Sequence, residues 1–128
     1  MNAKQHQLRD ADYLNHMLEA VKLARSYVEG LSKADFLADK RTQQAVILNI
    51  IVIGEAATQL VDEHSEFAAH NPEIPWQKMR GMRNRMAHGY FDTNLDIVWD
   101  TVQQAFPELE QQILRLQARN LNPSPPCA

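Results

Sequence analysis

The fold is decided by residues 45–60, which read AVILNIIVIGEAATQL. The first half of this stretch is rich in β-branched residues, which are common in buried strands. Its flanks favour a helix, because the glutamines and alanines on both sides are helix-compatible and bring no turn signal. We therefore predict one long helix that Asp39 can cap and that runs to about His64. Since it is apolar over most of its circumference, we expect it to be buried on more than one side.

The apolar stretch does not predict a membrane span. It is shorter than the roughly 20 residues that a spanning helix needs, and Asn49 and Glu55 interrupt it. We therefore expect a core helix and no membrane partner. Gly54 lowers the helix propensity within it, and we expect this glycine to let another helix approach closely.

Helical patterns also dominate on both sides of this stretch. Apolar residues recur three or four positions apart in each of them. The expected helices cover residues 8–28, 39–64, 76–88 and a last segment from 94 onward. Gly30 is the expected stop of the first helix, and Asn71–Pro75 is the expected loop before the third. The expected caps are Ser32, before a short turn to Leu37, and then Asp39 and Asn94. Pro107 either kinks the last helix or restarts it. Short loops between such helices predict an all-α, antiparallel up-down four-helix-type bundle, with a possible short extra helix and a kinked C-terminal helix.

The chain has 128 residues and 45% hydrophobic composition, which suits one domain with a core of its own. We expect this domain to cover residues 1–120 and the tail 121–128 to be disordered. Cys127 is the single cysteine, so no disulfide can form within the chain. Met1 to Asp12 is polar and does not resemble a secretory signal. These features predict a cytoplasmic protein.

Charge is distributed unevenly along the chain. The net charge of -3 argues weakly against a protein that coats nucleic acid over its whole surface. Residues 74–91 nevertheless contain no acid, and four bases fall within eight positions of this segment: Lys78, Arg80, Arg83 and Arg85. Acids then predominate until Arg115. This pattern predicts a local phosphate-binding site, with a solvated basic face as the alternative.

The same segment contains His88, and histidine is the residue type most often used for acid–base catalysis. Arg80, Asn84 and His88 are four apart in succession, so a helix that continues to His88 would place them on one face. Arg83 and His88 are five apart, which separates them by about 140° on a regular helix. For both to meet one phosphate, either the helix must end before His88 or a second copy of the chain must complete the site. We therefore expect a homodimeric active site.

The segment resembles the signature region of HepT-like proteins in the HEPN superfamily. Arg83, His88 and Tyr90 match the Arg-x4-His-x-Tyr motif of that family position for position. The surrounding matches are Ile74–Trp76, Gly81–Asn84, His88–Phe91, Trp99 and, in the long helix, Ile53–Ala56. The likeness covers most of residues 5 to 118.

The resemblance implies the toxin of a type II toxin–antitoxin pair, a metal-independent endoribonuclease without a cofactor. Arg83 would bind the scissile phosphate of RNA, and His88 would move the proton of the ribose 2′-hydroxyl. A minimal nucleotidyltransferase antitoxin would silence the toxin by attaching AMP to Tyr90. The residues expected to support the site or bind phosphate are Asn84, Arg80, Arg85, Lys78 and Glu55. Glu55 would pair with an arginine of the motif or, equally well, face solvent.

Two other functions remain open at this point. The chain could be a non-catalytic HEPN subunit that binds a nucleotide or a partner within a nucleotidyltransferase complex. It could also be a purely structural, dimerising bundle, in which the basic segment has no role.

Overall fold

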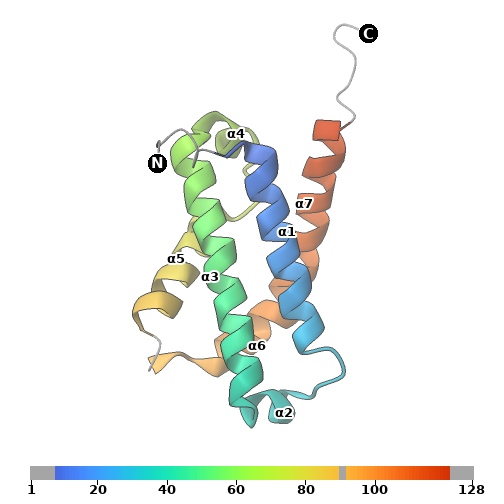
Figure 1. The fold of residues 1–128 in the computed structure, drawn as a ribbon, viewed down its shortest axis with the longest axis vertical. Helices are drawn as coiled ribbons and strands as arrows, with labels where there is room; N and C mark the ends of the chain where they lie inside the picture. Colours follow the sequence, from blue (N-terminus) through green and yellow to red (C-terminus); the bar gives the residue numbers. More distant parts are fainter. Residues whose placement is uncertain (1–7, 90–91, 122–128) are drawn as a thin grey trace, which may run out of the picture.

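The computed structural model describes residues 8–89 and 92–121, and this part of the chain folds as a helical bundle without strands (Figure 1). The elements in chain order are α1 (Asp10–Tyr27), α2 (Lys33–Leu37), α3 (Lys40–Glu63), α4 (Ser65–His70), α5 (Trp76–His88), α6 (Leu95–Asp100), the π-helix η3 (Thr101–Ala105) and α7 (Phe106–Leu121). The all-α prediction is confirmed. The expected disordered tail lies, from residue 122 on, outside the described residues.

The main helices run up and down in turn, with α6, η3 and α7 forming the last of them (Figure 1). Helix α3 lies in the centre and packs against α1 on one side and α5 on another, while α7 packs against α1. Helix α5 makes its main helix contacts with α3 alone. The predicted antiparallel bundle is therefore confirmed, and α5 is supported chiefly from one side.

Helix α3 begins where the sequence predicts. The Asp39 carboxylate accepts hydrogen bonds from the backbone N–H of Thr42 (3.2 Å) and from its hydroxyl (2.6 Å), which lowers the pKa of Asp39. The buried side chains of α3 include Val46, Ile50, Ile53, Ala57 and Leu60. The 24 residues of α3 are, by length and composition, enough to cross a membrane, although its most apolar stretch, residues 45–60, is shorter, as predicted. Half of its most apolar 18-residue segment is buried inside the bundle.

The other predicted caps are also present. Gly30 has a φ of 79°, a conformation that glycine adopts easily and that ends α1. Ser32 accepts a hydrogen bond from the Asp35 N–H (3.1 Å) at the start of α2. Asn94 accepts two hydrogen bonds from backbone N–H groups at the start of α6. Local side-chain chemistry thus sets these helix ends.

Helix α4 was not predicted. The chain leaves the helical conformation at His64, whose φ is -132°. The Nε2 atom of His64 lies 2.8 Å from the carbonyl oxygen of Leu8, and the His64 ring packs edge-on against the Tyr13 ring. The predicted end of α3 near His64 is therefore confirmed, and contacts with residues distant in the sequence hold the chain at this position.

The predicted interruption at Pro107 takes the form of a π-helix. Proline has no N–H to donate, so a helical hydrogen bond is lost at this place. The helix changes from α to the wider π form in η3, which ends two residues before Pro107, and returns to the α form in α7. Val98, Val102 and Phe106 remain buried throughout, so the apolar face passes the interruption intact.

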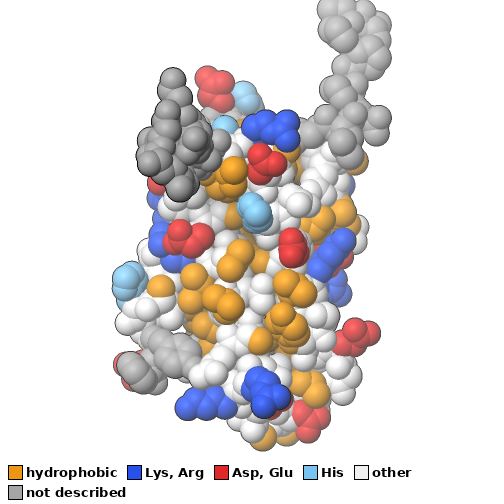
Figure 2. Space-filling model, viewed as in Figure 1, with side chains coloured by type: hydrophobic (Ala, Val, Ile, Leu, Met, Phe, Trp, Pro, Cys, Tyr) orange, Lys and Arg blue, Asp and Glu red, His pale blue; other side chains and the backbone are white. Residues whose placement is uncertain are grey.

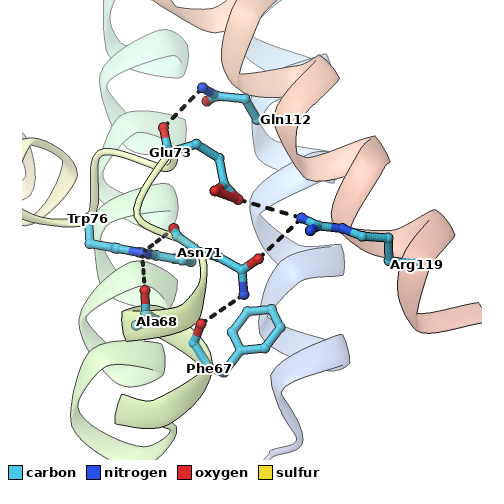
Figure 3. A network of polar contacts seen from close by, with 7 residues as sticks. All are labelled: Phe67, Ala68, Asn71, Glu73, Trp76, Gln112 and Arg119. Carbon is cyan, nitrogen blue, oxygen red and sulfur yellow. Dashed lines mark hydrogen bonds and ion pairs between the residues drawn. The ribbon is translucent and has the colours of Figure 1, made fainter. Parts of the chain in front are cut away.

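The loop before α5 is fixed to α7 (Figure 3). Trp76 is buried, and its Nε1–H lies 3.1 Å from the carbonyl oxygens of Ala68 and Asn71. Arg119 on α7 donates to the Asn71 side chain (3.2 Å) and forms an ion pair with Glu73 (3.5 Å). These contacts fix the start of α5, although the rest of this helix packs mainly on α3.

Candidate functional site

Helix α5 distributes its polar side chains over two faces. Arg80 and Arg83 point to α3 and form ion pairs there. Lys78, Arg85 and His88 lie on another side, where they line surface hollows. The sequence separations explain this division, since residues three or four apart share a helix face.

The α3-facing side carries two ion pairs. Arg83 donates a short hydrogen bond from Nη1 to Glu55 Oε1. Arg80 donates to Asp62 Oδ1 (2.9 Å) and to Thr58 Oγ1 (3.4 Å). The expected pairing of Glu55 with a motif arginine is therefore confirmed. The Glu55 side chain is also 50% exposed, so it faces solvent at the same time.

The Glu55 pair leaves part of the Arg83 guanidinium unused. An arginine side chain has five N–H donors, and among the described residues Arg83 forms a hydrogen bond with Glu55 alone. Its Nε is buried and has no hydrogen-bond partner within that part of the chain. The side chain is 23% exposed. The buried Nε cannot reach an incoming anion. Glu55 thus holds Arg83 in place, and the Nη2 group, which donates to no described residue, is the donor left for an anion such as a phosphate.

Gly54 allows α3 and α5 to approach closely at this point. A Cβ atom on Gly54 would lie 2.2 Å from the Cβ of Arg83 and 2.7 Å from the backbone oxygen of Met79. Neither of these atoms is the free end of a flexible side chain. The prediction that Gly54 serves a close helix approach is confirmed, and the contact is with the motif arginine itself.

The other face of α5 opens into a hollow of about 540 Å³ at the end of the helix. Asn84, His88 and Gly89 line it from α5, and Asp92 and Ile97 line it from the following segment. His88 is exposed and is the last residue of α5. An exposed imidazole at the edge of a hollow can exchange protons with a bound substrate.

One copy of the chain does not bring Arg83 and His88 to a common site. Helix α5 continues to His88, so the possibility that it ends earlier is wrong. Arg83 does not line the hollow of His88. Arg80, Asn84 and His88 follow one another at four-residue spacing along the regular helix, as expected, but the Arg80 side chain forms an ion pair with Asp62 on α3 and does not line the hollow. Asn84 and His88 do share the hollow.

Tyr90 lies outside the described residues, directly after Gly89. Lys78 and Arg85, the remaining expected phosphate-binding residues, are both exposed. Sequence reasoning missed Thr58 and Asp62 as partners of Arg80, and Asp92 as a neighbour of the hollow. The spacing of Glu55, Thr58 and Asp62 along α3 is a usable signal, since it puts all three on one helix face.

Comparison with known proteins agrees with the motif. The family model described as "Ribonuclease HepT-like" matches residues 17–116. This chain belongs to the HepT-like family. It is 36% identical to "Probable ribonuclease HepT" of Thermococcus cleftensis over 83% of this chain and 94% of that protein. It is 35% identical to "Putative RNase TTE0752" of Caldanaerobacter subterraneus over 79% of this chain and 88% of that protein. No solved structure gave a significant match.

Membership of the HepT-like family assigns the chain to a group whose relatives carry the names of ribonucleases. The match covers both α3, with Gly54 and Glu55, and α5, with Arg83 and His88. The ion pairs, the close helix approach and the hollow therefore all lie within the region that defines the family.

The close contact at Gly54 gives a first prediction. Gly54→Ala should lower the free energy of unfolding by about 1–3 kcal/mol, the usual cost of overpacking a core. Alanine improves helix propensity by about 1 kcal/mol, but the clash involves Cβ and backbone atoms and should prevail. The measurement is thermal or urea unfolding. Gly81→Ala is the matched control, since no atom lies within 4 Å of a Cβ there, and its stability should not fall. Equal stability of Gly54→Ala and the parent would show that the helices separate freely.

Proposed function

We propose that this protein is a metal-independent endoribonuclease that acts as a homodimer and is the toxin of a type II toxin–antitoxin pair. The observation that carries the proposal is the state of the two motif residues on α5. His88 is exposed at the edge of a hollow, and Glu55 orients the partly exposed Arg83 side chain, whose Nη2 group donates to no described residue. Membership of the HepT-like family supports the same activity.

The proposed reaction is a transesterification within the RNA chain. The ribose 2′ oxygen forms a bond to the adjacent phosphorus, and the bond from phosphorus to the 5′ oxygen breaks. His88 accepts the 2′-hydroxyl proton, and a proton is returned to the departing 5′ oxygen. Arg83 binds the phosphate and stabilises its developing negative charge. The products are a 2′,3′-cyclic phosphate and a free 5′-hydroxyl, so DNA, which lacks the 2′-hydroxyl, is not a substrate.

Arg83 and His88 lie apart within one chain, and the proposed homodimer would allow residues of two chains to form one site. Because they face different sides of α5, a partner copy that covers the Arg83 side can complete a cleft with its own residues. Leu48 and Val52 on α3 precede Glu55 by seven and three positions and share its face. Leu48 is 60% exposed, unusually high for a large apolar side chain.

Apolar side chains extend this exposed face over two helices. Figure 2 shows hydrophobic side chains gathered over the lower parts of α1 and α3. The exposed large hydrophobic residues on these helices are Leu23, Tyr27, Leu48 and Val52. A second copy that covers them would bury apolar surface and would lie next to the Glu55–Arg83 pair. We therefore propose this face as the dimer interface.

The cleavage proposal predicts that the protein, freed of any partner, cuts single-stranded RNA in the presence of EDTA. His88→Ala should abolish the cutting, because no other group would accept the 2′-hydroxyl proton. His70→Ala is the matched control: His70 is also exposed and also ends a helix, and its loss should leave activity unchanged. Gel analysis of labelled RNA and of the end groups provides the measurement. RNA that is still cut by His88→Ala would remove His88 from the mechanism. Intact RNA with the parent protein would favour a non-catalytic HEPN binding subunit.

The interface proposal predicts that Leu48→Glu dissociates the dimer, because it places charges within an apolar contact. Light scattering should show a change from dimer to monomer, and RNA cleavage should fall with it, while the circular dichroism spectrum stays helical. Ile97→Glu, an exposed apolar residue on α6 outside this face, should remain a dimer. A Leu48→Glu protein that stays dimeric would place the interface elsewhere.

We propose further that a minimal nucleotidyltransferase antitoxin inactivates the toxin by transferring AMP to Tyr90. Tyr90 directly follows Gly89, which lines the hollow of His88. An anionic nucleotide attached there would offset the positive charge that binds RNA.

This proposal predicts a mass increase of one or more AMP units when the chain is produced with its partner and ATP. Mass spectrometry should find no increase for Tyr90→Phe and an unchanged increase for Tyr27→Phe. Tyr27 and Tyr13 are the other two tyrosines of the chain, and Tyr13 is buried and donates to Glu63 (3.0 Å). AMP on Tyr27 or Tyr13 would contradict the assignment.

A further inference from the structure

A second hollow continues from the one that holds His88. It is a groove of about 780 Å³ between α5 and the segment formed by α6, η3 and α7. Met82, Arg85 and Ile97 line both hollows, so the two are contiguous. The groove exists because α5 packs mainly on α3 and leaves its opposite side open. Its volume lies in the range of small-ligand sites.

The groove combines an apolar floor with cations on one rim. Its apolar lining includes Ile50, Ile53, Met79, Met82, Ile97 and Phe106. Ile97 is 44% exposed, so apolar surface is accessible to a ligand. Lys78 and Arg85 lie on the α5 side, seven residues and thus roughly 10 Å apart along one helix face.

Both rim cations are available for an anion. Lys78 forms no ion pair or hydrogen bond within the described residues, and the contact found there for the Arg85 guanidinium is with Met82 Sδ, at 3.6 Å. The acids of the groove are Glu73, which is paired with Arg119, and Glu108. Asp92 lies beside His88 in the neighbouring hollow. Phosphates should therefore follow the α5 rim, away from these carboxylates.

We propose that the groove binds an unstacked nucleotide of single-stranded RNA next to the linkage at which His88 accepts the 2′-hydroxyl proton. The base contacts the apolar surface of Met82 and Ile97, and Lys78 and Arg85 bind the adjacent phosphates. This inference rests on the proposed function, since it names the substrate of the same site. Sequence-tolerant binding of single strands commonly combines cations along the backbone with apolar or aromatic surfaces for the bases. A duplex keeps its bases stacked and paired, so it cannot place one in the groove.

Binding can be separated from cleavage in the His88→Ala background. A short fluorescent single-stranded RNA, titrated in EDTA and followed by anisotropy, should bind this full-length protein. Adding Ile97→Glu should weaken binding by about tenfold or more, because a carboxylate replaces the apolar contact and repels the phosphates. Adding Lys78→Ala or Arg85→Ala should weaken binding and lower its salt dependence. Lys40→Ala, an exposed lysine at the start of α3, is the matched control and should bind like the background.

The location of the base can be tested directly with 4-thiouridine placed at each position of the same RNA. Crosslinks mapped by mass spectrometry to Met82, Ile97 or their immediate neighbours would support the inference. Crosslinks confined to other surfaces, unchanged binding by the Ile97→Glu protein, equal affinity for duplex RNA or an absence of RNA binding would each overturn it.

The two proposals fail in different ways. Cleavage by the parent protein together with crosslinks outside the groove would leave the nuclease proposal intact and reject the groove. Crosslinks in the groove without any cleavage by the parent protein would reject the nuclease and keep the groove as an RNA-binding site.

Discussion

The close approach of α5 to α3 at Gly54 is the constraint on which the rest of the structure depends. A side chain at this position would overlap the Cβ of Arg83, so the glycine determines how close the motif arginine lies to α3. Glu55, the next residue on α3, then forms an ion pair with the guanidinium. Two consecutive residues of one helix thus fix the backbone position and the side-chain direction of Arg83. A flexible arginine loses conformational freedom when it binds a phosphate, and part of that loss is already incurred in the fold.

The same packing separates the two residues of the motif. Helix α5 stays regular to its last residue, so the arginine that contacts α3 and the histidine at the end of the helix face different directions. A single chain therefore provides two half-sites. This geometry is the reason for proposing a homodimer. The exposed apolar residues Leu48 and Val52 on α3 lie on the same helix face as Glu55.

The one-sided support of α5 has a second consequence. Fixed by the contacts of Trp76 and Arg119 at its start and by α3 along its length, the helix leaves its other side open to solvent. Cations and apolar side chains alternate there along the groove that leads to His88. The helix that contributes the motif residues thus also forms one wall of the proposed substrate path, so in this proposal one element positions both the RNA-binding residues and the motif residues.

The amino-acid sequence alone was enough to predict the main helices, most of their ends and the residues of the motif. Caps such as Asp39, Ser32 and Asn94 act on backbone groups within a few residues, and apolar periodicity reports which helix face is buried. These are local effects, so they can be read from neighbouring letters.

Tertiary structure decided what depends on contacts between distant residues. Helix α4, which starts directly after His64, was not predicted, and the contacts of His64 with Leu8 and Tyr13 come from distant parts of the chain. The ion pair with Asp62 likewise directs the Arg80 side chain to α3, so that it does not line the hollow of Asn84 and His88. The groove beside α5 likewise depends on how α6, η3 and α7 pass the bundle. Helix periodicity limits which residues can share a face. Which neighbour each face contacts follows from the packing of the whole chain, because the apolar and charged faces of one helix can each pack against more than one partner helix.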